Sequence, residues 1–152
     1  MFNLRYFPLI ISLSFTLPIY SDEVEEIVVT ALKRSSTVVD TPAAITAISS
    51  TEIEDKGITN MHDLKHLVPS MNFTSVLGAQ NITIRGIGQF NGNPGVSVST
   101  DGIFQSRAHS SQLGEMDLER VEVLRGPQGT LYGRNSIGGV VNLITKNPTQ
   151  DM

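Results

Sequence analysis

Two histidines are the first residues whose spacing could support chemistry. His62 and His66 are four residues apart, which is the separation of a zinc-binding pair on one face of a helix. The residue after the first histidine is Asp63, where the metalloprotease pattern has glutamate, and no third ligand is evident. The pattern therefore favours a solvated helix face, and we expect no metal site.

Nucleophilic catalysis finds no better support. The third histidine, His109, stands in a loop segment beside Ser110 and Ser111, and no Ser–His–acid arrangement stands out. The chain has no cysteine, which excludes disulfides, thiolate metal ligands and cysteine nucleophiles together. We expect a protein that is not an enzyme and has no catalytic residues and no cofactor.

The glycine-rich segments resemble nucleotide-binding loops only superficially. Residues 126–136 have the wrong glycine spacing for a P-loop, Arg134 replaces the lysine, and Pro127 removes a backbone donor. Gly86 and Gly88 lack the third glycine of a dinucleotide fingerprint. Because 12 of the 13 glycines lie between Gly78 and Gly139, this region is expected to specify backbone conformation more than side-chain chemistry.

Two arginines are more informative. Arg85 and Arg125 each end a strand-like run and are followed directly by Gly86 and Gly126, so each guanidinium is presented where the backbone turns. They could be two ordinary surface arginines. Alternatively, they could be a pair of fixed forks that bind carboxylates on another surface.

Local patterns predict the elements that position these residues. Residues 43–48 read as a strand, and a capping box formed by Ser49 and Glu52, or by Thr51 and Glu54, opens a short helix that Gly57 ends. A second short helix is expected between the cap residue Asn60 and Pro69, with apolar positions on one face at Met61, Leu64, Leu67 and Val68.

After Pro69, apolar residues recur at every second position, which is typical of strands. Strands are predicted over residues 72–76, 82–85, 96–99, 121–124 and 140–144, and Asp101-Gly102 is a tight-turn dipeptide before residues 103–104. With 152 residues, these elements predict one α+β domain: a small mixed β-sheet with short helices and long Gly-rich loops. The connections 86–95 and 105–115 are long enough to suggest functional loops.

The N-terminus predicts export. Residues 1–21 place Arg5 before an apolar stretch interrupted by prolines and serines, which is the order of a secretory signal peptide and too short for a membrane-spanning helix. The whole chain has 11 basic against 15 acidic residues and a net charge of -4, so nucleic-acid binding is not expected.

After the acidic residues 22–26, residues 27–31 are rich in β-branched side chains. They could form an edge strand of the domain, or a tethered peptide that adds a strand to a partner's sheet. Residues 33–37 are charged and small, and they read as a linker.

Residues 118–142 closely resemble the plug-domain signature of TonB-dependent outer-membrane receptors. Three further stretches match in the order of that family: residues 26–31 resemble the TonB box, residues 84–86 the first Arg-Gly turn, and residues 101–103 the hairpin. The resemblance implies a signal peptide at 1–21, a TonB box and linker at 22–37, a plug at 38–148, and the start of a barrel at 149–152. It also implies an outer-membrane protein that takes up a nutrient such as a ferric siderophore, another metal chelate, a vitamin or a sugar.

The resemblance assigns roles residue by residue. The partners it implies are TonB, the receptor β-barrel and a small-molecule ligand. The TonB box comprises Glu26, Ile27, Val28, Val29, Thr30 and Ala31; Arg85 and Arg125 meet barrel glutamates; the structural glycine turns are Gly86, Gly102, Gly126, Gly129, Gly133, Gly138 and Gly139; candidate ligand contacts are Gln89, Phe90, Asn91, Arg107 and His109.

Because family members continue into a barrel, the chain is expected to be a fragment that cannot transport alone, and to be periplasmic if it is expressed alone. The alternative is a free-standing periplasmic module that binds TonB without transport.

Overall fold

A mixed five-stranded sheet forms the centre of the computed structural model. The structure describes residues 27–33, 35–39, 41–76, 79–89, 92–105 and 117–148, so the predicted signal peptide and the residues after 148 lie outside the described part. The strand order is β3-β8-β9-β6-β7, where β6 pairs with β9 in parallel and the other pairs are antiparallel. The strands are β3 (Ile45–Ser49), β6 (Val96–Thr100), β7 (Ile103–Phe104), β8 (Leu118–Arg125) and β9 (Gly139–Thr145).

These strands confirm the predicted mixed sheet, and Asp101-Gly102 makes the predicted turn between β6 and β7. The Asp101 carboxylate also accepts hydrogen bonds from the Thr145 backbone N–H at 3.0 Å and from the Thr145 hydroxyl at 2.8 Å. The turn is therefore anchored to the end of β9 at the centre of the sheet.

Two short helices follow β3, as the capping patterns predicted. Helix α1 (Ser50–Asp55) begins at the cap residue Ser49, whose side chain accepts a hydrogen bond from the backbone N–H of Glu52. The second helix, η1 (Met61–His66), is a 3-10 helix with a reciprocal capping box between Asn60 and Asp63. The observed caps are those that the sequence specifies, whereas the tighter helical form was not predicted.

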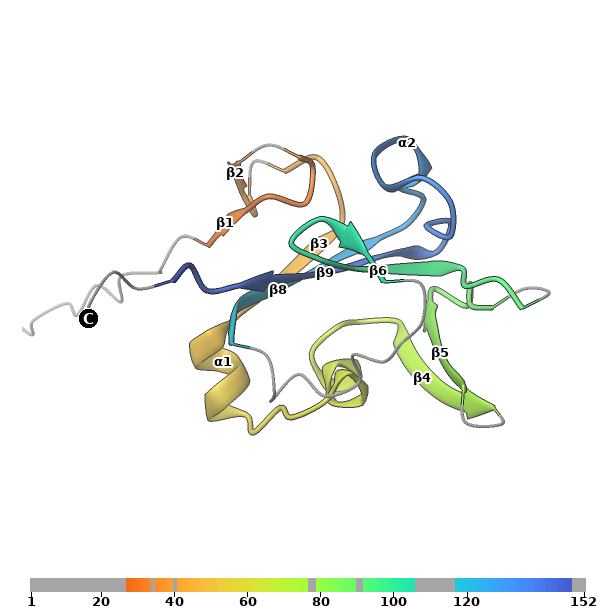
Figure 1. Ribbon diagram of the computed structural model, residues 1–152, viewed down its shortest axis with the longest axis horizontal. Coiled ribbons are helices and arrows are strands. Elements are labelled where there is room, and N and C mark those ends of the chain that lie inside the picture. Colours follow the sequence, from red (N-terminus) through yellow and green to blue (C-terminus); the bar gives the residue numbers. More distant parts are fainter. Residues whose placement is uncertain are drawn as a thin grey trace, which may run out of the picture.

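One face of the sheet carries the larger core. Helices α1 and η1 and the hairpin of β4 (Met71–Val76) with β5 (Ala79–Ile84) lie beneath the sheet in Figure 1. The buried apolar side chains between these layers form one cluster, which includes Ile48, Met61, Leu64, Ile84, Val121, Val123, Val141 and Leu143. Their removal from water is the main stabilising term of the domain.

The opposite face is covered by the N-terminal residues. Strands β1 (Val28–Val29) and β2 (Ser36–Thr37) form a small antiparallel hairpin above the sheet, on the side where helix α2 (Gly129–Tyr132) also lies (Figure 1). A second buried cluster comprises Val29, Ala31, Ile45, Leu124 and Val140. Residues 36–37, predicted as part of a linker, thus form β2, because pairing with β1 satisfies their backbone.

Strand β1 is not an edge strand of the central sheet, because it pairs only with β2. Helix α2 was not predicted, since four residues that start with glycine carry little helical signal. In the described part of the chain, no helix is long and apolar enough to cross a membrane.

Candidate functional site

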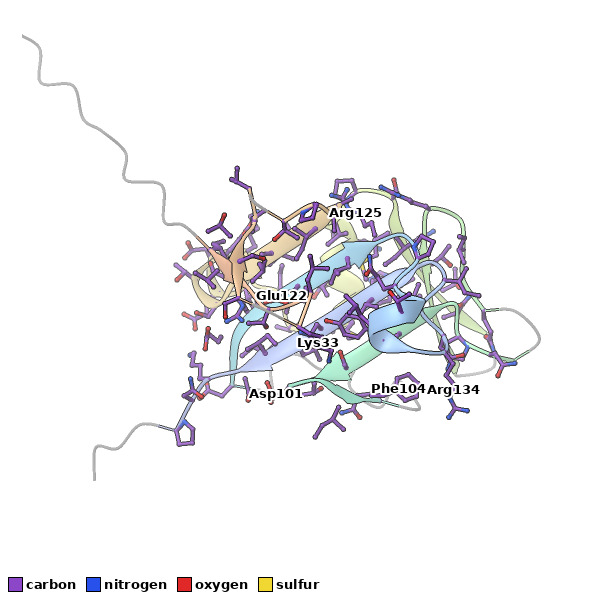
Figure 2. The ribbon with its side chains drawn as sticks, turned by 90° about the horizontal axis from the view of Figure 1, so that it is seen from above. Lys33, Asp101, Phe104, Glu122, Arg125 and Arg134 are labelled. Atoms are coloured by element: carbon purple, nitrogen blue, oxygen red, sulfur yellow. The ribbon has the colours of Figure 1, made fainter. Side chains whose placement is uncertain are left out.

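Residues 27–33, which we call the N-terminal strap, run across one face of the central sheet. Val29 and Ala31 have an exposed fraction of 0%, whereas Val28, the first residue of β1, is 50% exposed. This alternation places every second strap residue on the sheet. In Figure 2, which looks down on this face, the strap passes over the strands near Glu122 and Lys33. Five of the six residues predicted as the TonB box, residues 27–31, therefore lie in a docked segment.

A buried carboxylate lies under the strap. Glu122 of β8 has an exposed fraction of 0%, and its Oε1 accepts hydrogen bonds from the Thr30 backbone N–H at 2.9 Å and from the Arg120 Nε at 2.8 Å. The Arg120 side chain is only 11% exposed and also donates to the Thr30 hydroxyl at 3.2 Å. A carboxylate in such a place is tolerable only because it is paired and hydrogen-bonded.

The polar contacts continue across the sheet. Asn142 of β9 lies opposite Glu122 and donates to its Oε2 at 3.4 Å, and Ser99 of β6 donates to the Asn142 Oδ1 at 2.8 Å. Glu122, Asn142 and Ser99 occupy one row of the β8–β9–β6 register and are all buried. The strap face therefore carries a hydrogen-bonded polar row that ends at the Thr30 backbone.

Helix α2 provides a second contact to the strap. The Tyr132 hydroxyl donates a hydrogen bond to the Ala31 carbonyl at 2.7 Å, and the Lys33 ammonium lies 4.7 Å from the centroid of the Tyr132 ring. Burial, and to a smaller extent the negative charge of Glu122, raises the pKa of Tyr132 to about 12. The hydroxyl therefore stays protonated, and able to donate, further into the alkaline range than that of a free tyrosine.

The side chain of one predicted arginine, Arg85, reaches the turn that follows the other, Arg125. A Cβ added to Gly126, the residue after Arg125, would lie 3.5 Å from a terminal nitrogen of Arg85. Within the described residues neither arginine forms a salt bridge, and the buried Nε of Arg125 has no hydrogen-bond partner. Arg85 adopts a φ of 53°, a left-handed conformation that is uncommon for a residue with a side chain.

Glycine is required at this end of the sheet by close packing. A Cβ on Gly139 would lie 2.3 Å from the carbonyl oxygen of Leu124, and its φ is 155°. Gly138 is also crowded, by Ile87, whereas a Cβ on Gly129 would meet no heavy atom within 4 Å, and Gly129 opens α2. The other predicted turn glycines all have positive φ: Gly86, Gly102, Gly126 and Gly133.

Of the candidate ligand contacts, only Gln89 falls within the described residues. It is exposed, and its backbone N–H donates to the Asn81 side chain at 2.8 Å. Phe90, Asn91, Arg107 and His109 lie outside the described part, as does Glu26 of the predicted box.

The two spaced histidines lie on an exposed surface of η1, as expected for a solvated face. His62 lies 3.1 Å from the ammonium of Lys65, and its ring contacts Phe73 with a centroid separation of 6.0 Å. Among the described residues, no group of three or more acidic, histidine or cysteine side chains could hold a metal ion.

The sequence reasoning missed the residues that hold the strap: Arg120, Glu122, Tyr132 and Asn142. A glutamate between two valines of a strand reads as a solvent-facing position. In the structure both faces of β8 are covered, so alternation gave no signal of its burial.

A comparison with protein families identifies the class. Residues 37–140 match the model of the TonB-dependent Receptor Plug Domain. The chain belongs to this family, as the motif at residues 118–142 predicted. Its relatives are receptors and not enzymes, which agrees with the interpretation of the sequence.

Individual relatives agree with this assignment. The chain is 35% identical over 127 residues to the pesticin receptor of Yersinia pestis, covering 80% of this chain and 19% of the relative. It is 36% identical over 126 residues to the catecholate siderophore receptor Fiu of Escherichia coli, covering 78% and 16%. The chain thus spans about a fifth of the length of the curated relatives it matches.

The folds also correspond. The ferric yersiniabactin uptake receptor FyuA from Yersinia pestis superposes with a TM-score of 0.65 at 33% sequence identity, over 72% of this chain and 18% of that one. The mixed sheet with few short helices is therefore the plug fold.

Proposed function

We propose that the chain is the gating plug of an outer-membrane receptor that takes up an iron–siderophore complex, and that residues 26–31 are its TonB box. The siderophore is suggested by relatives whose names describe receptors for ferric yersiniabactin and for catecholate siderophores. The signal peptide predicted at residues 1–21 is consistent with a location in the outer membrane. On its own, the plug would not transport.

One observation carries the proposal most directly. A terminal nitrogen of Arg85 reaches the turn at Gly126, the residue after Arg125, and neither arginine has a carboxylate partner within the described residues. Guanidinium groups without a carboxylate partner of their own are suited to bidentate contacts with carboxylates on a surrounding wall. Glutamates of a receptor β-barrel would supply those carboxylates and fix the plug in the lumen.

The seating role is tested by Arg125→Ala in a full-length relative. We expect the plug to be digested faster by an added protease, because a bidentate contact to the barrel is lost. Lys65→Ala, a partly exposed lysine on η1, is the matched control. Unchanged protease resistance in Arg125→Ala would contradict the assignment.

The box is tested with a peptide of residues 22–40 and the C-terminal periplasmic domain of TonB. Val29→Pro deletes a backbone donor from the added strand, so calorimetry should show weaker binding. Val39→Pro places the same change outside the box and should bind like the parent peptide. Equal affinities for the two proline peptides would argue against residues 26–31 as the TonB contact.

A further inference from the structure

The connection between β5 and β6 is pinched where its two ends meet. A Cβ added to Gly95 would lie 2.1 Å from the carbonyl oxygen of Gly88, so the two backbones are in direct contact. We call Ile87, Gly88 and Gly95 the neck, which lies at the end of the sheet where β6 and β9 begin (Figure 1). Surface loops whose ends lie this close together are frequently functional.

The neck is fixed to the sheet. The Gly138 N–H, just before β9, donates to the Gly95 carbonyl at 2.8 Å, and both glycines are buried. A Cβ on Gly138 would lie 2.9 Å from the carbonyl oxygen of Ile87. Ile87 also exchanges two backbone hydrogen bonds of 3.0 Å with Ile84, at the end of β5. Neither end of the connection can therefore move without disturbing the sheet.

One side chain extends this order to an exposed residue. Asn81 and Thr83 flank the core residue Ile82 on β5, so both lie on the face of the hairpin away from the core. The Asn81 Oδ1 accepts a hydrogen bond from the backbone N–H of Gln89, which is exposed, at 2.8 Å. A Cβ on Gly88 would lie 2.6 Å from the Thr83 Oγ1 and 3.2 Å from the Asn81 Oδ1. Asn81 thus determines the direction in which Gln89 leaves the neck.

The contact between Asn81 and Gln89 adds local order more than stability. It is exposed, so water can replace the Asn81 oxygen if that oxygen is lost, and the net contribution of such a hydrogen bond to folding is small. A binding residue that is already held in one conformation loses less conformational entropy when a ligand binds. The contact is therefore suited to raising affinity.

We infer that Asn81 is a positioning residue, which together with the neck holds Gln89 in one orientation for a ligand at this end of the plug. The side-chain amide of Gln89 can donate to and accept from the oxygen-rich groups around a chelated ferric ion. This inference rests on the proposed function, because it takes a ferric siderophore as the ligand.

The first test measures amide hydrogen exchange at Gln89 in the full chain. Asn81→Ala removes the acceptor, so exchange should quicken about two- to tenfold, while urea denaturation should show unchanged stability. Asn81→Asp keeps an acceptor oxygen and should return the exchange rate to that of the parent chain. If Asn81→Ala leaves exchange at Gln89 unchanged, the positioning role is wrong.

Asn72 offers matched controls on the same face of the hairpin. It pairs with Thr83, is exposed, and its Oδ1 accepts from the Phe73 N–H and not from Gln89. Asn72→Ala and Asn72→Asp therefore repeat the loss of an amide and the gain of a charge. Both should leave exchange at Gln89 as in the parent chain, and an equal change in these controls would contradict a specific role for Asn81.

The second test uses ferric yersiniabactin as the probe and nuclear magnetic resonance as the readout. Paramagnetic Fe(III) broadens the signals of amides close to it, whereas the gallium complex of the same chelator is diamagnetic. In the parent chain the Gln89 amide should broaden with the ferric complex alone. In Asn81→Ala the same broadening should require about two- to tenfold more probe, because Gln89 is no longer held for binding.

The outcomes separate this inference from the proposed function. If the parent chain and Asn81→Ala broaden at equal probe concentrations, the chain binds the chelate but Asn81 does not position Gln89 for it. If other amides broaden and Gln89 does not, the ligand binds elsewhere and the inference fails while the siderophore assignment stands. If no amide broadens, the siderophore assignment loses support and the inference fails with it; Arg125→Ala still tests the seating of the plug.

Discussion

The two faces of the central sheet are covered in different ways. Beneath it, α1, η1 and the β4–β5 hairpin close a wholly apolar cluster of large side chains such as Met61, Leu64 and Leu143. Above it, the strap contributes only Val29 and Ala31 as fully buried side chains, and it lies over a polar row that includes Glu122.

The two faces should therefore differ in how easily their covering segments open. The free energy gained by burying apolar side chains is proportional to the area removed from water. The lower face therefore provides most of the stability and unfolds with the whole domain. The upper face is held by a few directional contacts, which can break while the lower core remains intact. Substitutions on the two faces should therefore differ in their effect on the free energy of unfolding.

The largest effect is expected from Leu143→Ala, in the lower core. Truncating a fully buried leucine removes its transfer free energy and leaves a cavity, so the free energy of unfolding should fall by about 2–5 kcal/mol. Urea denaturation followed by circular dichroism measures it. A loss well below 1 kcal/mol would show that this face is not the main core.

Arg120→Met should have the next largest effect and lower the free energy of unfolding by about 3 kcal/mol. The change leaves Glu122 buried without its counter-ion, although the Thr30 N–H and Asn142 still donate to it. The same denaturation experiment measures the loss, with the exposed Lys56→Met on α1 as the control. A stability equal to that of the control would mean that the polar row does not depend on this charge.

Val29→Ala should cost only about 1–2 kcal/mol, because it removes two methyl groups from the strap. We expect amide exchange to quicken at Thr30 and Lys33 while β8 and β9 keep their protection. If exchange instead quickened uniformly across the sheet, the strap would unfold together with the core and the contrast between the faces would disappear.

The smallest effect is that of alkaline pH on the stability, through the ionisation of Tyr132. Since the pKa of Tyr132 is raised from 10.0 to about 12, the native state holds its proton where the unfolded chain loses it. Its contribution to stability is therefore constant below pH 10 and is lost as the pH rises from 10 through about 12.

Ultraviolet titration can measure this pKa cleanly. The chain has three tyrosines, and Tyr6 and Tyr20 lie in the predicted signal peptide, so a chain that starts at residue 22 reports Tyr132 alone. Tyrosinate absorbance in the native protein should have its midpoint near pH 12, and in urea near pH 10. Equal midpoints would mean that the ring is not buried beside the strap.

Much of the fold could be predicted from the sequence, because local rules dominate at helix ends and turns. Ser49 and Asn60 cap the two helices as expected, and Asp101-Gly102 closes the predicted turn. These features depend on contacts between residues a few positions apart, which short motifs specify. The contact of Tyr132 with the carbonyl of Ala31 could not be predicted in this way, because the two residues are 101 positions apart.

For the candidate site, the sequence singled out Arg85, Arg125 and residues 26–31, but it left open whether residues 27–31 pack on the domain or extend from it. The signature that resembled the family is long and specific, so the family model at 37–140 could be anticipated. The burial of Glu122 could not be anticipated, because it depends on which segment of the chain covers that face of the central sheet.

The family was predictable from the long signature at residues 118–142, and most strands, the two capped helices and the glycine turns from residue types and short spacings. The long-range contacts came from the folded structure alone: Thr30 and Ala31 bind Glu122 and Tyr132, and the Arg85 side chain reaches the turn at Gly126. Long-range contacts of this kind arise from the packing of whole layers, and no local pattern encodes them.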